Sequence, residues 1–329
     1  MKLTNRQRVM YALQYVFLLI ALLFIGFLLF DQWTQLRAEK WRYHSGWFSL
    51  SVAFLLASWW LEIEIWRRLL IHIGDSVKLS SLAAIRIWFL SAVVRYIPGN
   101  IWQPLSMTVR CQQRGIRPEA TLASIMLFQI VILLGVIPIA GLYFWIVGYR
   151  TLLPADITWI NQSIVWLLWL GTILAIATFV LFMLRPQWFF ALGNWGLQKL
   201  NRPPLDVTLS SATLAWFVLL AVVNWVLWGA SFAALTFAIG DLSTTQMWAA
   251  LGHLMAAFPI AYAIGFISFL TPSGLGVREG AFYVLLTPVV GGAIATVAAL
   301  ATRIVSTLGE LIIAGICLWF QGNLQKTRN

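Results

Sequence analysis

The sequence predicts an all-α polytopic membrane protein that forms a single domain over residues 1–329. Hydrophobic residues make up 61% of the chain and charged residues only 10%, whereas a soluble domain carries about 25% charged residues. Apolar runs of about 20 residues, long enough to cross a bilayer as helices, recur along the chain. No polar block between them is long enough to fold as a separate soluble domain, so we expect one transmembrane domain.

Six apolar runs predict full membrane spans. The first run follows Lys2, Arg6 and Arg8 and resembles a signal peptide. It is long, however, and no small-residue cleavage site follows it, so we expect a retained span. The six runs cover residues 11–30, 46–66, 120–147, 160–184, 210–239 and 303–320.

The run 79–96 is shorter and ends in RYIPGNIWQP, where Pro98 and Gly99 disfavour a continuous helix. If residues 79–110 form a re-entrant hairpin that enters from the cytoplasm, 14 Lys and Arg residues lie in cytoplasmic segments and 4 lie outside. If residues 79–96 cross fully, the counts become 7 and 11. Basic residues collect in cytoplasmic loops. We therefore expect the hairpin, with both termini cytoplasmic.

The stretch TPSGLGVREG, residues 271–280, interrupts two further apolar runs at 248–270 and 281–301. These runs form either a second re-entrant hairpin that enters from outside or two full spans with a short cytoplasmic loop. Charge counting does not separate the two, because both leave the C-terminus inside. Two hairpins from opposite faces would resemble the inverted repeats of transporters. The expected fold is about six full spans plus two broken or re-entrant helical hairpins.

The two breaks and the intramembrane charges predict a polar groove. Irregular backbone persists at membrane depth only where it is buried in protein or lines a watery cavity, although a break of this kind can also be an ordinary surface loop. Ionisable residues within spans are costly and usually face a bundle interior or a polar pathway. Those in the predicted spans and hairpins are Glu62, Glu64, Arg86, Arg95, Arg278, Glu279, Arg303 and Glu310.

Two spacings refine this prediction. Arg303 and Glu310, with Ser306 and Thr307 between them, recur at i, i+3, i+4 and i+7, which predicts a polar stripe on one helix face. The alternative role for that stripe is helix–helix contact. Arg86 and Arg95 are nine residues apart, so both can face one groove only if their helix bends or unwinds before Pro98. Glu62 can pair with Arg86 at similar depth.

Other functional classes lack their signatures. The net charge of +11 fits cytoplasmic loops better than nucleic-acid binding. The sequence has no G-x-x-x-x-G-K-[ST] loop, no G-x-S-x-G elbow and no H-E-x-x-H helix, and GLGVREG is not a dinucleotide fingerprint. Its three histidines are scattered and its two cysteines are far apart. We expect no catalytic residue, no metal and no cofactor.

RYIPGNIWQ at residues 95–103 and TPSGLGVREG at residues 271–280 resemble the paired signatures of the lysylphosphatidylglycerol synthase/flippase membrane-domain family. The resemblance covers about residues 10–320 and implies an all-helical lipid-translocating domain in a bacterial inner membrane. Two-part members carry a cytosolic aminoacyltransferase domain after it. This sequence ends at Asn329, so we expect that domain, and the synthase activity, to be absent. The matching motif positions are Arg95, Pro98, Gly99, Gln103, Pro272, Gly274, Gly276, Arg278 and Glu279.

The expected function is translocation of a lipid head group, either an anionic phospholipid or a polyprenyl-phosphate-linked glycolipid. Arg95 and Arg278 would hold the phosphate and Arg86 and Arg303 would flank it, all as substrate-binding residues. Glu279, Glu310 or Glu62 would pair with an arginine in the empty site, which offsets the cost of a buried charge. The alternatives are a membrane enzyme of lipid or polyprenol-phosphate metabolism and a non-transporting partner of a lipid synthase. The expected partners are membrane lipids, with a lipid-synthesis enzyme as a candidate. The sequence gives neither the direction nor the oligomeric state.

Overall fold

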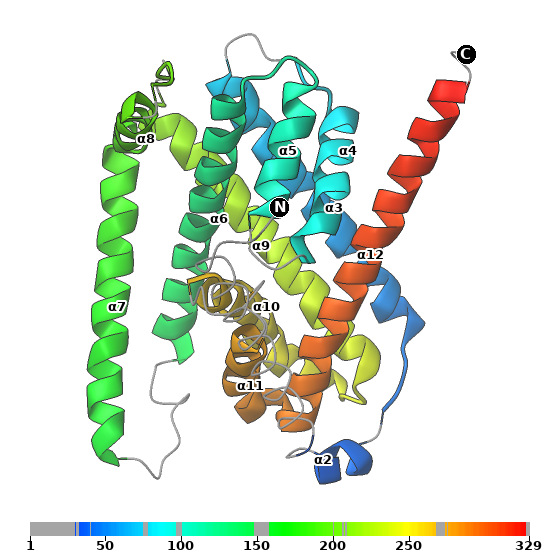
Figure 1. Cartoon of the computed structure of the whole chain (residues 1–329). Helices are drawn as coiled ribbons and strands as arrows, with labels where there is room; N and C mark the ends of the chain where they lie inside the picture. The colour runs from blue at the N-terminus through cyan, green and yellow to red at the C-terminus, as the bar shows by residue number, and fades with distance from the viewer. Residues whose placement is uncertain are drawn as a thin grey trace, which may run out of the picture. The chain divides into compact units, whose positions relative to one another are not determined.

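The protein is described here by a computed structural model (Figure 1). It describes residues 30, 33–39, 41–74, 78–96, 101–147, 158–199, 201–205, 207, 209–267, 274 and 276–326. Within these ranges the regular elements are helices, and the single β-contact is an isolated bridge between Trp41 and Gly240. The predicted span 11–30 falls, apart from its last residue, outside the described residues.

The chain packs into two compact units. Unit 1 comprises Met1–Leu56, Ile85–Met107 and Trp228–Asn329. Unit 2 comprises Ala57–Ala84 and Thr108–Leu227. Three segments that are distant in the sequence therefore build unit 1, and they include both predicted breaks.

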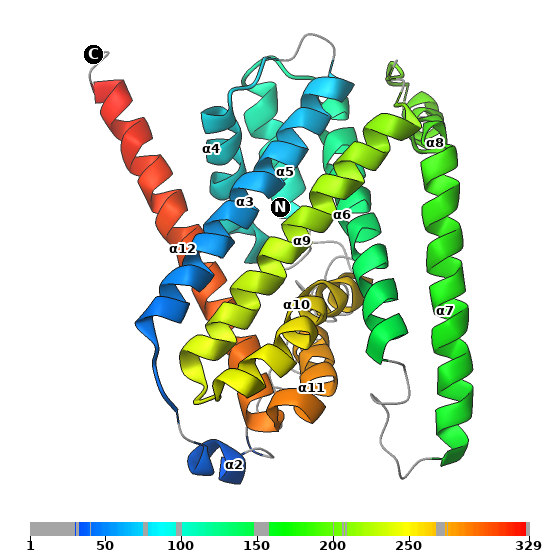
Figure 2. The same cartoon turned by 180° about the vertical axis from the view of Figure 1, so that it is seen from behind.

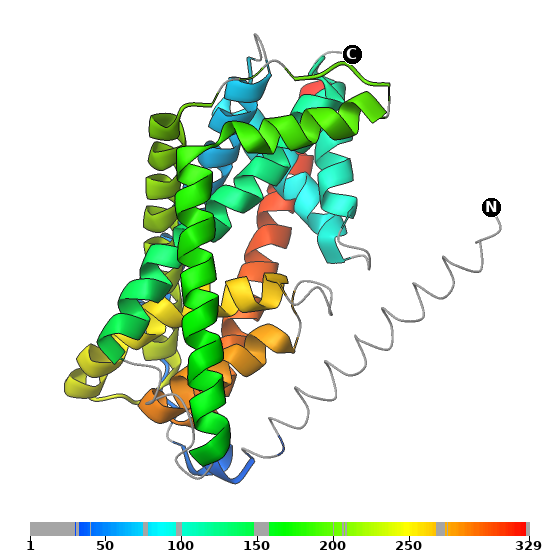
Figure 3. The ribbon, with the colours of Figure 1, turned by 90° about the vertical axis from the view of Figure 1, so that its left-hand side faces the viewer.

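Five helices in the described part of the chain are long and apolar enough to cross a membrane. A sixth span results if Trp169–Leu184 and Gln187–Lys199, which meet at 82°, are counted as one. Figure 3 shows the second of these helices running across the end of the first. The all-α polytopic prediction is thus confirmed: the runs 46–66, 120–147 and 160–184 lie within helices, and the run 210–239 does so from its second residue. The long helices are α3 (Ser45–Ile73), α6 (Pro118–Val147), α7 (Thr158–Leu184), α9 (Ser211–Ile239), α10 (Thr244–Ile267) and α12 (Gly292–Lys326); α8 is Gln187–Lys199 and α2 is Trp33–Ala38.

The first predicted break separates two short helices, α4 (Ser81–Ala92) and α5 (Trp102–Gln112). At 1.5 Å per residue they extend about 18 and 17 Å, well short of the ~30 Å hydrocarbon core. The Oγ atoms of Ser91 and Ser106 lie 3.0 Å apart in a hydrogen bond that holds the two helices side by side (Figures 1 and 2). Their lengths and pairing match the broken hairpin predicted for residues 79–110.

The second break separates α10 from α11 (Val277–Val290), which pack against each other (Figure 2). At about 21 Å, α11 is too short for a full span, which favours the hairpin alternative for this region. The predicted boundary between the runs 281–301 and 303–320 is wrong. α12 begins at Gly292, inside the first run, and continues without a break through the second. The chain turns at Gly291, whose φ of +82° is costly for other residues.

An aromatic cluster joins α9, α10 and α11 in the core of unit 1. Phe232, Phe258 and Phe282 are each at most 1% exposed. The rings of Phe232 and Phe282 stack with centroids 4.7 Å apart, and Phe258 lies within 5.9 Å of both. In unit 2, a hydrogen bond joins α9 to α6, because Trp225 Nε1 donates to the Ile132 carbonyl at 2.8 Å. The cluster in unit 1 fixes α11 on α10 and so positions the residues that follow the second break.

Candidate functional site

Two ion pairs bring the predicted intramembrane charges of unit 1 together on α12. Arg303 Nε lies 3.0 Å from Glu279 Oε1, and Arg95 Nη1 lies 3.0 Å from Glu310 Oε1. Residues 303 and 310 are two helical turns apart, about 10.5 Å along the same face. The polar stripe is therefore confirmed, and α12 carries one partner for each broken hairpin.

The first hairpin reaches α12 through a change in helix type. α4 tightens into the 3₁₀ helix η1 (Val93–Tyr96), which carries Arg95 and contacts α12. The regular α-helix thus ends before Pro98, while the joint placement of Arg86 and Arg95 in one groove stays a prediction; Pro98 and Gly99 themselves lie outside the described residues. Arg95 Nε also donates to Gln103 Oε1 at 3.1 Å, so one arginine ties both ends of the break to α12.

Arg86 and Glu62 do not join these contacts. Arg86 is partly buried on α4 but enters neither of the two ion pairs. Glu62 belongs to unit 2, so its pairing with Arg86 stays a prediction. Glu64, two residues closer to the end of α3, pairs with Arg67 and Arg68 at 2.6 and 2.8 Å.

At the second hairpin, Glu279 performs two tasks at the start of α11. Its Oε2 accepts the Gly276 N–H at 2.6 Å, while its Oε1 pairs with Arg303. A carboxylate in the first helical turn is favourable because the helix N-terminus carries a partial positive charge. Gly276 has a φ of +85° and Gly274 a φ of +66°. The glycines thus let the chain turn sharply enough for Glu279 to reach both partners; Pro272 lies outside the described residues.

Gly274 also lies against the end of α10, which gives a testable prediction. A Cβ at residue 274 would lie 2.9 Å from Gly265 Cα, and a positive φ costs a non-glycine residue about 1–2 kcal/mol. We expect Gly274→Ala to lower the thermal unfolding midpoint in detergent. The matched control is Gly252→Ala on α10, which has open space and should stabilise its helix by about 1 kcal/mol. Equal midpoints for the two variants would contradict the close contact.

Arg278 sits on an aromatic cage rather than beside a carboxylate. Its guanidinium carbon lies 4.6 Å from the ring centroid of Phe258, 5.6 Å from Phe282 and 5.9 Å from Tyr262. These distances are typical of cation–π contacts. Its Nε is buried and finds no hydrogen-bond acceptor in the part of the chain that the structure describes. Arg278 therefore keeps hydrogen-bond donors available in an otherwise apolar setting.

The cage was not predicted from the sequence, although its spacing was available. Phe258 and Tyr262 are four residues apart on α10, as Arg278 and Phe282 are on α11, so each pair shares a helix face. The predicted charges that the structure describes in unit 1 include the guanidinium groups of Arg95, Arg278 and Arg303, whereas only Arg95 and Arg303 have a carboxylate partner, Glu310 and Glu279 respectively. The excess positive charge suits an anionic ligand.

Comparisons with known proteins identify the family. No curated protein that was compared matches the chain. The family model described as the lysylphosphatidylglycerol synthase TM region matches residues 14–314, which include both breaks and both ion pairs on α12. The multi-pass helical fold agrees with a membrane domain. The chain therefore belongs to the lysylphosphatidylglycerol synthase transmembrane-region family, a lipid-related family of membrane domains.

Proposed function

We propose that this membrane domain moves the phosphate-bearing head group of a lipid across the bilayer. The head group, of an anionic phospholipid or a polyprenyl-phosphate-linked glycolipid, would pass through a groove lined by residues 95–103 and 271–280 while its tails stay in the bilayer. The observation that carries the proposal is Arg278, a cation on three aromatic rings whose Nε lacks an acceptor among the described residues.

The chemistry of this arrangement fits a phosphate. A guanidinium presents donors in a planar fork that matches phosphate oxygens. Arg278 would bind first because Glu279 holds Arg303 and Glu310 holds Arg95 while the site is empty. An arriving phosphate can then bind Arg95 and Arg303 as well, while Glu310 and Glu279 stay beside them. Arg86 would flank the bound phosphate. The ion pairs thus keep the empty site stable.

The proposed location is a bacterial inner membrane, from the family, with cytoplasmic termini, from the distribution of basic residues. An anionic head group that moves outward across an inside-negative membrane gains roughly 2.3 kcal/mol per charge per 100 mV. The membrane potential alone can therefore drive outward movement. Because no covalent step is needed, the proposed domain is not an enzyme and needs no metal or cofactor.

Leaflet exchange in liposomes tests this proposal. The purified chain is reconstituted with fluorescent anionic and zwitterionic phospholipids or a fluorescent polyprenyl phosphate, and the outer leaflet is quenched with dithionite. We expect faster exchange than in protein-free liposomes, with the anionic lipids ahead of the zwitterionic one. No exchange of any lipid, with or without an imposed potential, would contradict autonomous translocation. Conversion of a lipid to a new product in detergent, where no leaflets exist, would favour the enzyme alternative.

A further inference from the structure

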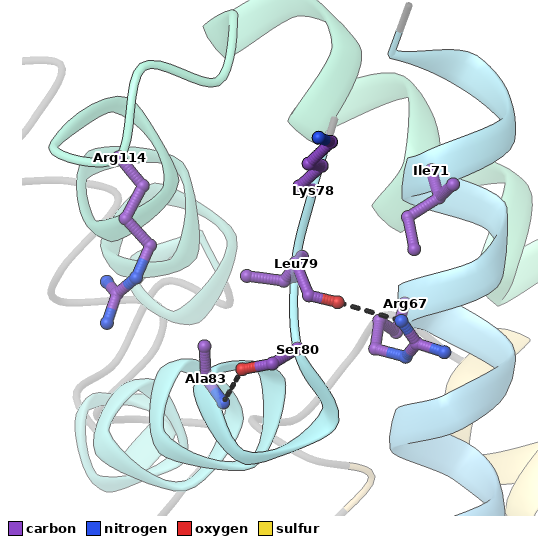
Figure 4. Close-up of a pocket in the computed structure, with 7 residues that line it drawn as sticks. All are labelled: Arg67, Ile71, Lys78, Leu79, Ser80, Ala83 and Arg114. Carbon is purple, nitrogen blue, oxygen red and sulfur yellow. Dashed lines mark hydrogen bonds between the residues drawn. The ribbon is translucent and has the colours of Figure 1, made fainter. Parts of the chain in front are cut away.

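Unit 2 contains a basic hollow that the proposed groove does not use. It has a volume of about 590 Å³ and lies between the end of α3 and the start of α4 (Figure 4). None of the described residues that line it is acidic. Its main lining residues are Arg67, Ile71, Lys78, Leu79, Ser80 and Arg114.

Arg67 forms a fixed wall of this hollow. Its Nε and Nη2 donate to the two carboxylate oxygens of Glu64 at 2.7 and 2.6 Å, and its Nη1 donates to the Leu79 carbonyl at 2.7 Å (Figure 4). These bonds tie the segment before α4 to α3. Glu64 also accepts from Arg68 at 2.8 Å, so a single carboxylate faces two guanidinium groups. The wall therefore keeps an excess of positive charge.

Lys78 and Arg114 provide the cations that a ligand can reach. Both side chains are exposed, and Figure 4 shows them on different segments, with Lys78 just before α4 and Arg114 to one side of it. Neither forms an ion pair within the described residues; Arg114 donates only to the Arg110 carbonyl, at 3.3 Å. Ser80 Oγ caps α4 by accepting the Ala83 N–H at 3.3 Å, so the positive end of the α4 dipole also lies at the hollow.

The position of the hollow on α3 indicates the source of its ligand. α3 has 29 residues and is about 43 Å long, so it extends beyond a ~30 Å hydrocarbon core into the head-group layer. The hollow lies at its final turns. A second hollow of about 580 Å³ shares Arg67 and Ile71 and adds the apolar side chains of Trp216 and Phe217. Cations beside apolar surface at the end of a span suit a lipid better than a soluble anion.

We propose that this hollow binds the phosphate group of an anionic phospholipid at the membrane surface, with Lys78 and Arg114 as its ligands. Trp216 and Phe217 would contact the upper part of the acyl chains. The site belongs to unit 2 and does not depend on translocation through the groove of unit 1. Its failure would therefore leave the proposed function standing, and failure of translocation would leave this site standing.

Native mass spectrometry of the full chain in detergent tests the site. The probes are dioctanoyl phosphatidylglycerol, dioctanoyl phosphatidylcholine and glycerol 3-phosphate. We expect preferential binding of phosphatidylglycerol, weakened by up to roughly 30-fold in the Lys78→Gln/Arg114→Gln variant, because an exposed ion pair contributes up to about 1 kcal/mol, or fivefold, per residue. The matched control is Arg185→Gln/Lys199→Gln, which removes the same charge from residues of unit 2 that line neither hollow.

The outcomes distinguish a specific phospholipid site from general charge attraction and from a site for a soluble phosphate ester. Phosphatidylglycerol binding that survives in the control variant but falls in the Lys78→Gln/Arg114→Gln variant supports the site. An equal loss in both variants would show general charge attraction and overturn it. Binding of glycerol 3-phosphate as tight as that of phosphatidylglycerol would assign the same cations to a soluble phosphate ester and overturn the lipid source. Equal binding of phosphatidylglycerol and phosphatidylcholine would show that the net charge of the lipid does not decide binding, and would overturn the proposed site for an anionic phospholipid.

Discussion

Arg278→Gln is expected to slow lipid exchange in liposomes by roughly 10- to 150-fold, because a hydrogen bond to a charged group is worth about 1.5–3 kcal/mol. Glutamine keeps polarity but removes the positive charge and the planar fork. The variant should fold, since Arg278 has no carboxylate partner among the described residues. Its thermal midpoint should equal or exceed that of the unmodified chain, because a partly buried cation is removed from an apolar cage.

Two companion variants make this result specific to the position. Arg278→Lys keeps the charge but not the fork, so it should retain part of the exchange rate. Arg42→Gln removes a charge from an exposed residue just before α3 and should exchange lipid at the unmodified rate. A folded Arg278→Gln protein with unchanged exchange would exclude Arg278 as the phosphate ligand.

Glu279→Gln is expected to cost the protein about 3 kcal/mol of stability, the low end for a broken buried pair, because Arg303 keeps 24% of its side chain exposed. The Glu279 side chain itself is only 4% exposed. Its replacement by an amide removes the buried ion pair with Arg303. The readout is the thermal unfolding midpoint in detergent. Adding Arg303→Gln to this variant should recover most of the loss, since the uncompensated charge then disappears.

A carboxylate with exposed arginine partners provides the control for this pair. The Glu119 side chain is 12% exposed and lies 4.0 Å from Arg117 and 3.5 Å from Arg202, whose side chains are at least half exposed. Because solvent can reach both arginines, each pair contributes about 1 kcal/mol at most, so Glu119→Gln should lower the midpoint less than Glu279→Gln does. A double variant no more stable than Glu279→Gln alone would contradict the ion pair with Arg303 as the source of the loss.

The sequence predicted the long helices and the α12 stripe well, for physical reasons. Length and hydropathy specify a span almost alone, because lipid excludes unsatisfied backbone groups. The period of 3.6 residues places Arg303 and Glu310 on one face. That period does not identify the partners across the interface, so the pairing of Glu279 with Arg303 and of Arg95 with Glu310 needed the structure.

Two features escaped the sequence because they arise from the tertiary fold or from backbone geometry. The apolar run continues across the end of α11 and the start of α12, and only the positive φ of Gly291 marks the boundary. The cage around Arg278 combines rings from α10 and α11. Each helix alone shows only a pair of residues four apart, and the rings converge on Arg278 because the hairpin folds those helices together.

The placement of both arginine–glutamate pairs on α12 has an evolutionary consequence. A substitution at residue 95 alone would remove the ion pair of Glu310, and one at residue 279 would remove that of Arg303. Selection would remove either single change, while a matched change on both sides, including an exchange of the two charges, keeps neutrality. In the descent of this domain, α12 is therefore constrained to change together with two separate segments that both precede it in the sequence.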